Sequence, residues 1–144
     1  MLRSTRQLCK IGHMTIIGSG QMGAGIAQVT AQNGINVTMV DLNQAALDRA
    51  IKTIDKSVSR VVAKKFKDDA AGGEAFKASI LDKVSVNTDV SVPAASTDLV
   101  CEAIVEDLGV KKTLFANLDG LCPESTIFAT NTSSLSVKGP VRFF

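Results

Sequence analysis

Aromatic residues are scarce in this sequence, which has no tryptophan, no tyrosine and only six phenylalanines among its 144 residues. Apolar residues nevertheless make up 45% of the chain, which excludes a disordered protein. The core must therefore be aliphatic, as in parallel sheets whose buried strands are rich in valine and isoleucine. The net charge of +2 is too small to indicate a nucleic-acid partner.

The sequence also lacks long apolar runs and clusters of metal-ligating residues. No apolar stretch approaches the length of ~20 residues that a membrane-spanning helix needs, so we expect no membrane partner. The three cysteines, Cys9, Cys101 and Cys122, follow no metal-binding or redox spacing, which favours reduced thiols and no metal. The only histidine, His13, begins the first predicted strand, where a structural or surface role is expected rather than a catalytic one.

Acidic residues are absent before Asp41, whereas the first ten residues carry three basic side chains beside serine and threonine. This pattern resembles a short mitochondrial transit peptide and predicts import into the mitochondrial matrix. The alternative is an ordinary basic tail. We treat residues 1–12 as this basic segment and residues 13–136 as one domain.

A glycine-rich turn is the most informative feature that the sequence does contain. An apolar strand ends at Ile17, and a Gly-x-Gly-x-x-Gly pattern then opens a helix. Glycines at this spacing allow a tight turn, a close approach to a pyrophosphate, and packing of helix on strand. The residues expected to hold the phosphates are Gly18, Ser19, Gly20, Gln21, Met22 and Gly23.

Asp41 supports the dinucleotide interpretation. It ends a second apolar run, 23 positions after Gly18, close to the ~20 residues at which an acidic group meets the adenosine ribose. Its carboxylate can accept both ribose hydroxyls and would repel a 2′-phosphate, so the predicted cofactor is NAD rather than NADP. The alternative, a glycine turn in some other βαβ unit, leaves Asp41 unexplained.

The remaining chain alternates strands and helices. Helices are predicted over residues 44–66, 74–81 and 108–121, and strands over 83–87, 98–105 and 126–130, with a break over 68–73. This order predicts an α/β fold: a Rossmann-type, doubly wound, mainly parallel sheet with an inserted helical hairpin. Ligands bind at the carboxyl ends of such strands, where the glycine turn, Glu106 and residues 131–134 all fall.

Three segments together resemble the L-3-hydroxyacyl-CoA dehydrogenase family, and its short-chain mitochondrial form in particular. They are residues 18–27, 98–106 and 129–135, and the likeness extends over about residues 11–136. It includes the hairpin with Lys64-Lys65-Phe66.

The resemblance implies a role for each matching residue. Glu106 and Lys111 would contact the nicotinamide half of NAD. Ser133 would hydrogen-bond near the nicotinamide and the substrate's 3-oxygen, with Asn131 as its neighbour. Other interpretations stay open: Lys111 as a solvated helix residue, Glu106 as the N-terminal charge of the next helix, and Ser133 as a helix cap.

Two further residues would meet coenzyme A. Ser57 and Lys64 match family positions for this contact, and an ammonium group can pair with phosphates. Lys64 could equally be a solvated helix residue.

The family oxidises a 3-hydroxyacyl-CoA to the 3-ketoacyl-CoA in fatty-acid β-oxidation, with NAD accepting the hydride. Its general base is a histidine, in a His-Phe-Phe-Asn-Pro context that this sequence does not contain, and residues 137–144 depart from the family pattern. The family's homodimer-forming domain is also absent from the sequence. We expect a chain that binds NAD and is weak or inactive alone. The alternatives are a non-catalytic isoform that binds NAD or a full-length subunit, and another NAD-dependent dehydrogenase of the hydroxyisobutyrate or phosphogluconate type.

Overall fold

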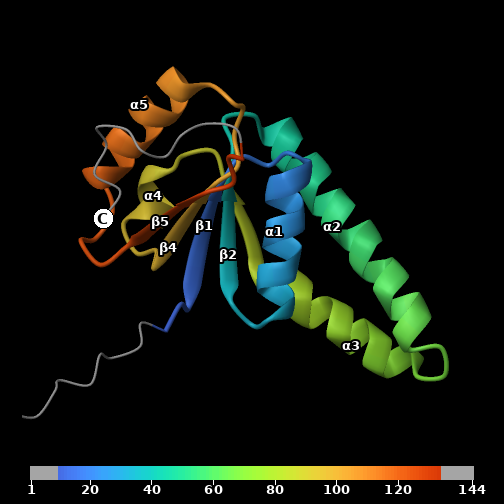
Figure 1. The fold of residues 1–144 in the computed structure, drawn as a ribbon. Coiled ribbons are helices and arrows are strands. Elements are labelled where there is room, and N and C mark those ends of the chain that lie inside the picture. The colour runs from blue at the N-terminus through green and yellow to red at the C-terminus, as the bar shows by residue number, and fades with distance from the viewer. Residues whose placement is uncertain (1–9, 134–144) are drawn as a thin grey trace, which may run out of the picture.

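A computed structural model of the chain describes residues 10–133. Five parallel strands form one sheet in the order β3-β2-β1-β4-β5 (Figure 1). They are β1 (His13–Ile17), β2 (Asn36–Val40), β3 (Val84–Asn87), β4 (Leu99–Glu102) and β5 (Ile127–Thr130). The strand order reverses between β1 and β4, which makes that junction the switch point at which α/β sheets bind ligands. Residues 1–9 of the predicted basic segment, and the predicted tail of residues 137–144, lie outside the described residues.

Helices lie on both faces of this sheet, as predicted for a doubly wound fold. The elements α1 (Gln21–Gln32), α2 (Gln44–Lys65) and α3 (Ala70–Leu81) lie on one side, and α4 (Ser91–Ala94) and α5 (Leu108–Asp119) on the other (Figure 1). The predicted Rossmann-type architecture is therefore confirmed.

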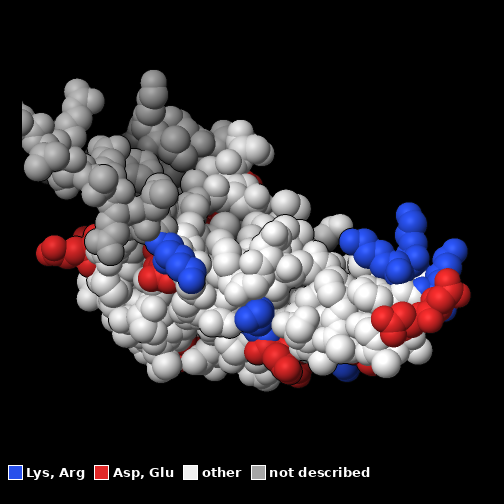
Figure 2. All heavy atoms as spheres, turned by 90° about the horizontal axis from the view of Figure 1, so that it is seen from below, with Lys and Arg blue, Asp and Glu red and all other residues white. Residues whose placement is uncertain are grey.

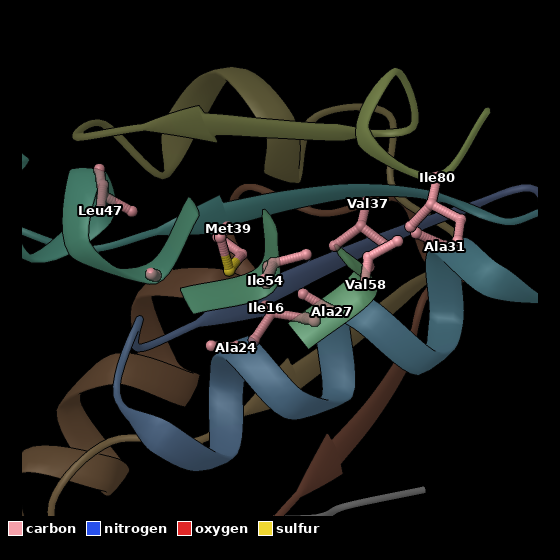
Figure 3. Close-up of a cluster of buried hydrophobic side chains, with 11 residues drawn as sticks. Ile16, Ala24, Ala27, Ala31, Val37, Met39, Leu47, Ile54, Val58 and Ile80 are labelled. Carbon is pink, nitrogen blue, oxygen red and sulfur yellow. The ribbon is translucent and has the colours of Figure 1, made fainter. Parts of the chain in front are cut away.

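The larger core fills the space between the sheet and the first three helices (Figure 3). Alternate residues of β1 and β2 point to this face because successive side chains of a strand alternate between its two faces. Small alanines on α1 allow that helix to lie close to the strands, while longer aliphatic chains from α2 and α3 fill the outer space. The buried residues include Ile16, Val37 and Met39 from the strands, Ala24 and Ala27 from α1, and Leu47, Ile54, Val58 and Ile80 from α2 and α3.

A smaller core lies on the opposite face, beneath α5. Ile17, Val40 and Val100 from three strands pack with Phe115 and Leu118 of the helix. Phe115 also makes an edge-to-face contact with a phenylalanine of β5, with ring centroids 6.0 Å apart. Both cores are formed mainly by aliphatic side chains, as the scarcity of aromatic residues predicted.

The helical hairpin is present, but its second helix begins earlier than predicted. Asn43 caps α2, as its side-chain oxygen accepts from the Ala45 amide at 2.9 Å. The predicted break over residues 68–73 is wrong for residues 70–73, because α3 begins at Ala70 and includes both glycines. A Cβ atom at Gly73 would lie only 2.7 Å from Val62 Cγ1. Glycine therefore permits close packing of the two helices here, and it does not end a helix.

Two other elements differ from their predictions. The short helix α4 was not predicted, since four residues are too few to show a helical period. Strand β4 ends at Glu102 rather than continuing to residue 105. The side chain of Glu102 accepts a hydrogen bond from the Ile104 backbone amide at 2.7 Å, which turns the chain away from the strand direction.

His13 and the described cysteines lie outside the candidate site. The His13 ring is 2.9 Å from Thr38 Oγ1, which agrees with the expected structural role. Cys101 and Cys122 are free thiols, and burial raises the pKa of each. Between residues 10 and 133, no helix is both long and apolar enough to cross a membrane.

Candidate functional site

A cavity of about 530 Å³ opens at the carboxyl ends of β1, β2 and β4. The glycine turn and Asp41 form its polar side, and the segment after β4 lies opposite them. Its apolar lining comes from Ile17, Val40, Val90, Ile104, Val110 and Leu114. A largely apolar hollow with a few polar groups at one rim is typical of a site for a small molecule or cofactor.

The first two motif glycines have different physical roles in this turn. Gly18 has φ +104°, a conformation that disfavours other residues, and a Cβ there would lie 2.5 Å from the Ala103 carbonyl oxygen. Gly20 instead faces open space, since no atom lies within 4 Å of the position its Cβ would take. The backbone can thus approach a ligand at Gly20.

Gly23 brings the beginning of α1 against β1. A Cβ at this position would overlap with the Gly18 carbonyl oxygen. The helix starts at Gln21 and has no acidic residue in its first turn. Its N-terminal amides and dipole therefore favour an anion beside the turn. This arrangement fits a dinucleotide pyrophosphate.

Asp41 is hydrogen-bonded to the glycine turn. Its Oδ2 accepts from the Ser19 hydroxyl at 2.6 Å and from the Ser19 amide at 3.0 Å, while Oδ1 accepts from the Asn43 amide at 3.1 Å. Partial burial raises the pKa of Asp41, but these bonds and the charge of Arg49 outweigh it, so the pKa lies below its ordinary value. Asp41 is thus an oriented carboxylate at the cavity rim.

Lys111 lies on the other side of the switch point and is buried, with only 5% of its surface exposed. Its Nζ lies 3.0 Å from Glu102 Oε2 and 3.4 Å from Glu106 Oε2. The interpretation of Lys111 as a solvated helix residue is therefore wrong.

Glu106 contacts the end of β5. The Thr132 hydroxyl donates to Glu106 Oε2 at 2.6 Å. This bond, together with Lys111 and the Ser133 backbone amide, holds the pKa of Glu106 below its ordinary value despite the opposing effect of desolvation. The helix α5 is capped by Asp107, whose side chain accepts from the Val110 amide at 2.9 Å. Asp107 is thus the capping residue, and Glu106 directly precedes it, so the interpretation of Glu106 as an N-terminal charge of α5 stays open.

The end of β5 brings the predicted substrate-side residues to the same edge. The Asn131 amide donates to the backbone oxygen of Glu102 at 2.8 Å, and Ser133 follows two residues later. Both side chains are exposed. A capping role for Ser133 depends on residues from 134 onward, which lie outside the described residues.

The sequence interpretation assigned no role to Glu102 or Thr130, and it included Thr132 only as part of residues 131–134. Glu102 Oε2 accepts from the Thr130 hydroxyl at 2.5 Å as well as from Lys111. A charged residue inside the otherwise apolar run 99–105 was the available signal.

Ser57 and Lys64 lie apart from this site, on α2. Ser57 is half-buried, and Lys64 is exposed in the last turn of the helix. In Figure 1 that end of α2 lies far from the glycine turn, and Figure 2 shows basic and acidic side chains gathered at the same end of the molecule. The coenzyme A contacts of these two residues stay a prediction.

Comparison with known proteins identifies the family. Residues 13–139 match the protein-family model described as "3-hydroxyacyl-CoA dehydrogenase, NAD binding domain". The chain belongs to this family. A probable 3-hydroxyacyl-CoA dehydrogenase of Caenorhabditis elegans is 48% identical over 93% of the chain and 43% of its own length. The mitochondrial hydroxyacyl-coenzyme A dehydrogenase of Sus scrofa is 46% identical over 88% of the chain and 40% of its own length.

Solved structures of 3-hydroxyacyl-CoA dehydrogenase relatives have the same fold. The 3-hydroxybutyryl-CoA dehydrogenase of Escherichia coli superposes with a TM-score of 0.81 and 40% identity, over 89% of this chain and 26% of that one. The (S)-3-hydroxybutyryl-CoA dehydrogenase of Ralstonia eutropha gives 0.79 and 38%, over 89% and 43%. The chain thus spans less than half the length of these relatives. NAD is the cofactor of the domain, and the alternative of a hydroxyisobutyrate or phosphogluconate type is set aside.

Proposed function

We propose that the chain binds NAD across the switch point and is the cofactor-binding part of an enzyme that oxidises 3-hydroxyacyl-CoA. The observation that carries this proposal is the convergence of two groups on one sheet edge. The glycine turn and Asp41 lie on the β1–β2 side, while Lys111 and Glu106 lie on the β4–β5 side. A dinucleotide has two halves that require such a divided site.

The adenosine half binds on the β1–β2 side. The pyrophosphate lies at the open backbone of Gly20 and the N-terminus of α1. Asp41 accepts the ribose hydroxyls, and its negative charge disfavours a 2′-phosphate. The apolar lining of the cavity takes the adenine ring.

The nicotinamide half binds beside β4 and β5, where Lys111 and Glu106 contact it. Bound NAD supplies the acceptor for the hydride of the substrate. Ser133 and Asn131 orient the substrate's 3-oxygen toward this position, since their side chains are exposed at the same edge. The two carboxylates of Glu102 and Glu106 outweigh the single positive charge of Lys111. The resulting net negative charge would attract the positively charged ring of oxidised nicotinamide.

Among residues 10–133, no histidine lies at this end of the sheet to take the hydroxyl proton. The only histidine of the sequence, His13, is at the start of β1, the opposite end from the glycine turn. Removing a general base typically lowers the rate by ~10²–10⁴-fold. We therefore propose that the 144 residues bind NAD but turn over substrate poorly by themselves.

The remaining proposals concern substrate and setting. Ser57 and Lys64 contact coenzyme A, Lys64 by pairing with a phosphate. We also propose that the protein lies in the mitochondrial matrix and acts in β-oxidation. Two observations support this: some relatives are named mitochondrial enzymes, and the N-terminal residues are basic. We also propose that a complete enzyme of this kind is a homodimer.

The test measures binding and turnover separately. Isothermal titration of the purified chain with NAD should give saturable binding. A parallel assay with NAD and 3-hydroxybutyryl-CoA, followed by NADH absorbance, should show little or no turnover. Absence of NAD binding would contradict the cofactor proposal, and rapid NADH formation would contradict the proposed lack of a base.

A further inference from the structure

We propose that Glu102 is a positioning residue of the cofactor site, which holds Lys111 and the end of β5 where the nicotinamide half of NAD is received. This inference rests on the proposed NAD site and assigns a role to a residue that does not itself line the cavity.

The burial and the bonds of Glu102 carry the inference. Its residue surface is 0% exposed, yet both carboxylate oxygens have partners. Oε1 accepts from the Ile104 amide at 2.7 Å, and Oε2 accepts from Lys111 Nζ at 3.0 Å and from the Thr130 hydroxyl at 2.5 Å. One side chain therefore joins the loop after β4, the helix α5 and the strand β5.

Lys111 lies between two carboxylates that are arranged alike. Glu102 and Glu106 each contact its Nζ, and each also accepts from a threonine hydroxyl, Thr130 and Thr132 respectively. An ammonium group has three N–H donors, and these contacts use two of them. The third can reach a ligand only in the direction that the two carboxylates leave open.

A purely structural role explains this arrangement poorly. A buried ion pair is often no more stabilising than well-packed apolar side chains of similar volume. The rest of β4 and the buried face of α5 are apolar, so two apolar side chains could replace Glu102 and Lys111 in this environment. Lys111 lies with Glu106 and Asn131 at the carboxyl ends of β4 and β5. We therefore assign to Glu102 the role of orienting the ammonium group of Lys111.

The experiment compares two ligands on one variant. ADP carries the adenosine and both phosphates but lacks the nicotinamide half, whereas NADH carries both halves. Glu102→Gln keeps the side-chain shape and removes the charge that orients Lys111. We expect NADH to bind about tenfold more weakly and ADP to bind within about twofold of wild type. Glu124→Gln, the same change at an exposed position, is the control and should alter neither affinity.

The possible outcomes separate the two proposals. A wild-type chain that binds neither ligand overturns the proposed NAD site and this inference with it. If wild type binds both ligands, then equal affinities in Glu102→Gln, or equal losses for NADH and ADP, overturn the positioning role alone.

A second variant decides the question if Glu102→Gln does not fold. Thr130→Val keeps the side-chain volume but removes the hydroxyl that donates to Glu102. It should weaken NADH about threefold and leave ADP binding unchanged. Unchanged NADH binding in this variant would contradict the inference.

Discussion

The Ser19 hydroxyl lies 2.6 Å from Asp41 Oδ2, and the Ser19 amide donates to the same oxygen at 3.0 Å. These bonds join the glycine turn after β1 to the end of β2. The carboxylate that we propose to receive the ribose is therefore oriented by the protein itself, which would reduce the ordering cost of binding. Asp41 and the glycine turn are thus held together as one unit.

Replacing Asp41 should change cofactor preference. Asp41→Asn keeps the shape but removes the negative charge, so NADH should bind about tenfold more weakly. NADPH should lose less affinity, because its 2′-phosphate no longer meets a carboxylate. Fluorescence titration with both cofactors measures this, with Asp68→Asn in the α2–α3 turn as control. An unchanged ratio of NADH to NADPH affinity would show that Asp41 does not select the cofactor.

Three glycines, Gly20 at the N-cap of α1 and Gly23 and Gly25 within the helix, should separate folding from binding. At Gly20 a methyl group meets no atom, so Gly20→Ala should change the free energy of unfolding by no more than ~1 kcal/mol yet weaken NADH several-fold. Gly25→Ala, also in open space, should raise stability by ~0.5–1 kcal/mol and leave binding intact. Gly23→Ala should destabilise by ~2 kcal/mol or more, because the methyl group overlaps with the Gly18 carbonyl.

Urea denaturation and NADH titration of the three variants provide the measurements. Equal NADH affinity in Gly20→Ala and Gly25→Ala would argue against a pyrophosphate at Gly20.

Stability should fall in acid because of Asp98 and Asp41. Asp98 accepts from the His13 and Gly12 amides, at 2.9 and 2.8 Å, and these bonds hold its pKa below the ordinary value of 3.8. A carboxyl group with a depressed folded pKa stabilises the fold above its unfolded pKa, and this stabilisation is lost as pH falls through the folded pKa. Urea unfolding should therefore show a plateau from about pH 5 upward and a decline below about pH 4.

Asp98→Asn offers the matched comparison for this decline. The variant should lose stability at neutral pH and show a shallower fall in acid than wild type. An identical slope in the two proteins would mean that Asp98 titrates alike in the folded and unfolded states.

Lys64 should affect only the acyl-CoA ligand. Lys64→Ala removes a cation from the last turn of α2, so acetoacetyl-CoA should bind about threefold to tenfold more weakly. NADH affinity should not change, because Lys64 lies apart from the glycine turn. Lys52→Ala, an exposed lysine on the same helix, is the control. Equal acetoacetyl-CoA affinity in both variants would exclude Lys64 from the coenzyme A site.

The sequence allowed prediction of the features that local patterns determine. The strand before Gly18, the position of Asp41 and the alternation of strands with helices each follow from spacing within a short stretch. The roles of Lys111 and Glu106 in the fold depend on which strands become neighbours, because their partners Glu102, Thr130 and Thr132 come from β4 and from β5 and its end. No periodicity within α5 shows that two carboxylates will surround one of its lysines.

The start of α3 was missed for a related reason. Glycine favours a break when only local propensity is considered, but at Gly73 close packing against α2 outweighs that cost.

The most direct test of the proposed site is an NMR titration of the ¹⁵N-labelled chain with NAD. We expect backbone amide shifts to change on both sides of the switch point, at Gly20 and Asp41 and also at Glu106 and Lys111. Amides at the amino-terminal ends of the strands, such as those of His13 and Lys83, should keep their chemical shifts. Changes confined to the amino-terminal ends of the strands, or no changes at saturating NAD, would contradict an NAD site at the switch point.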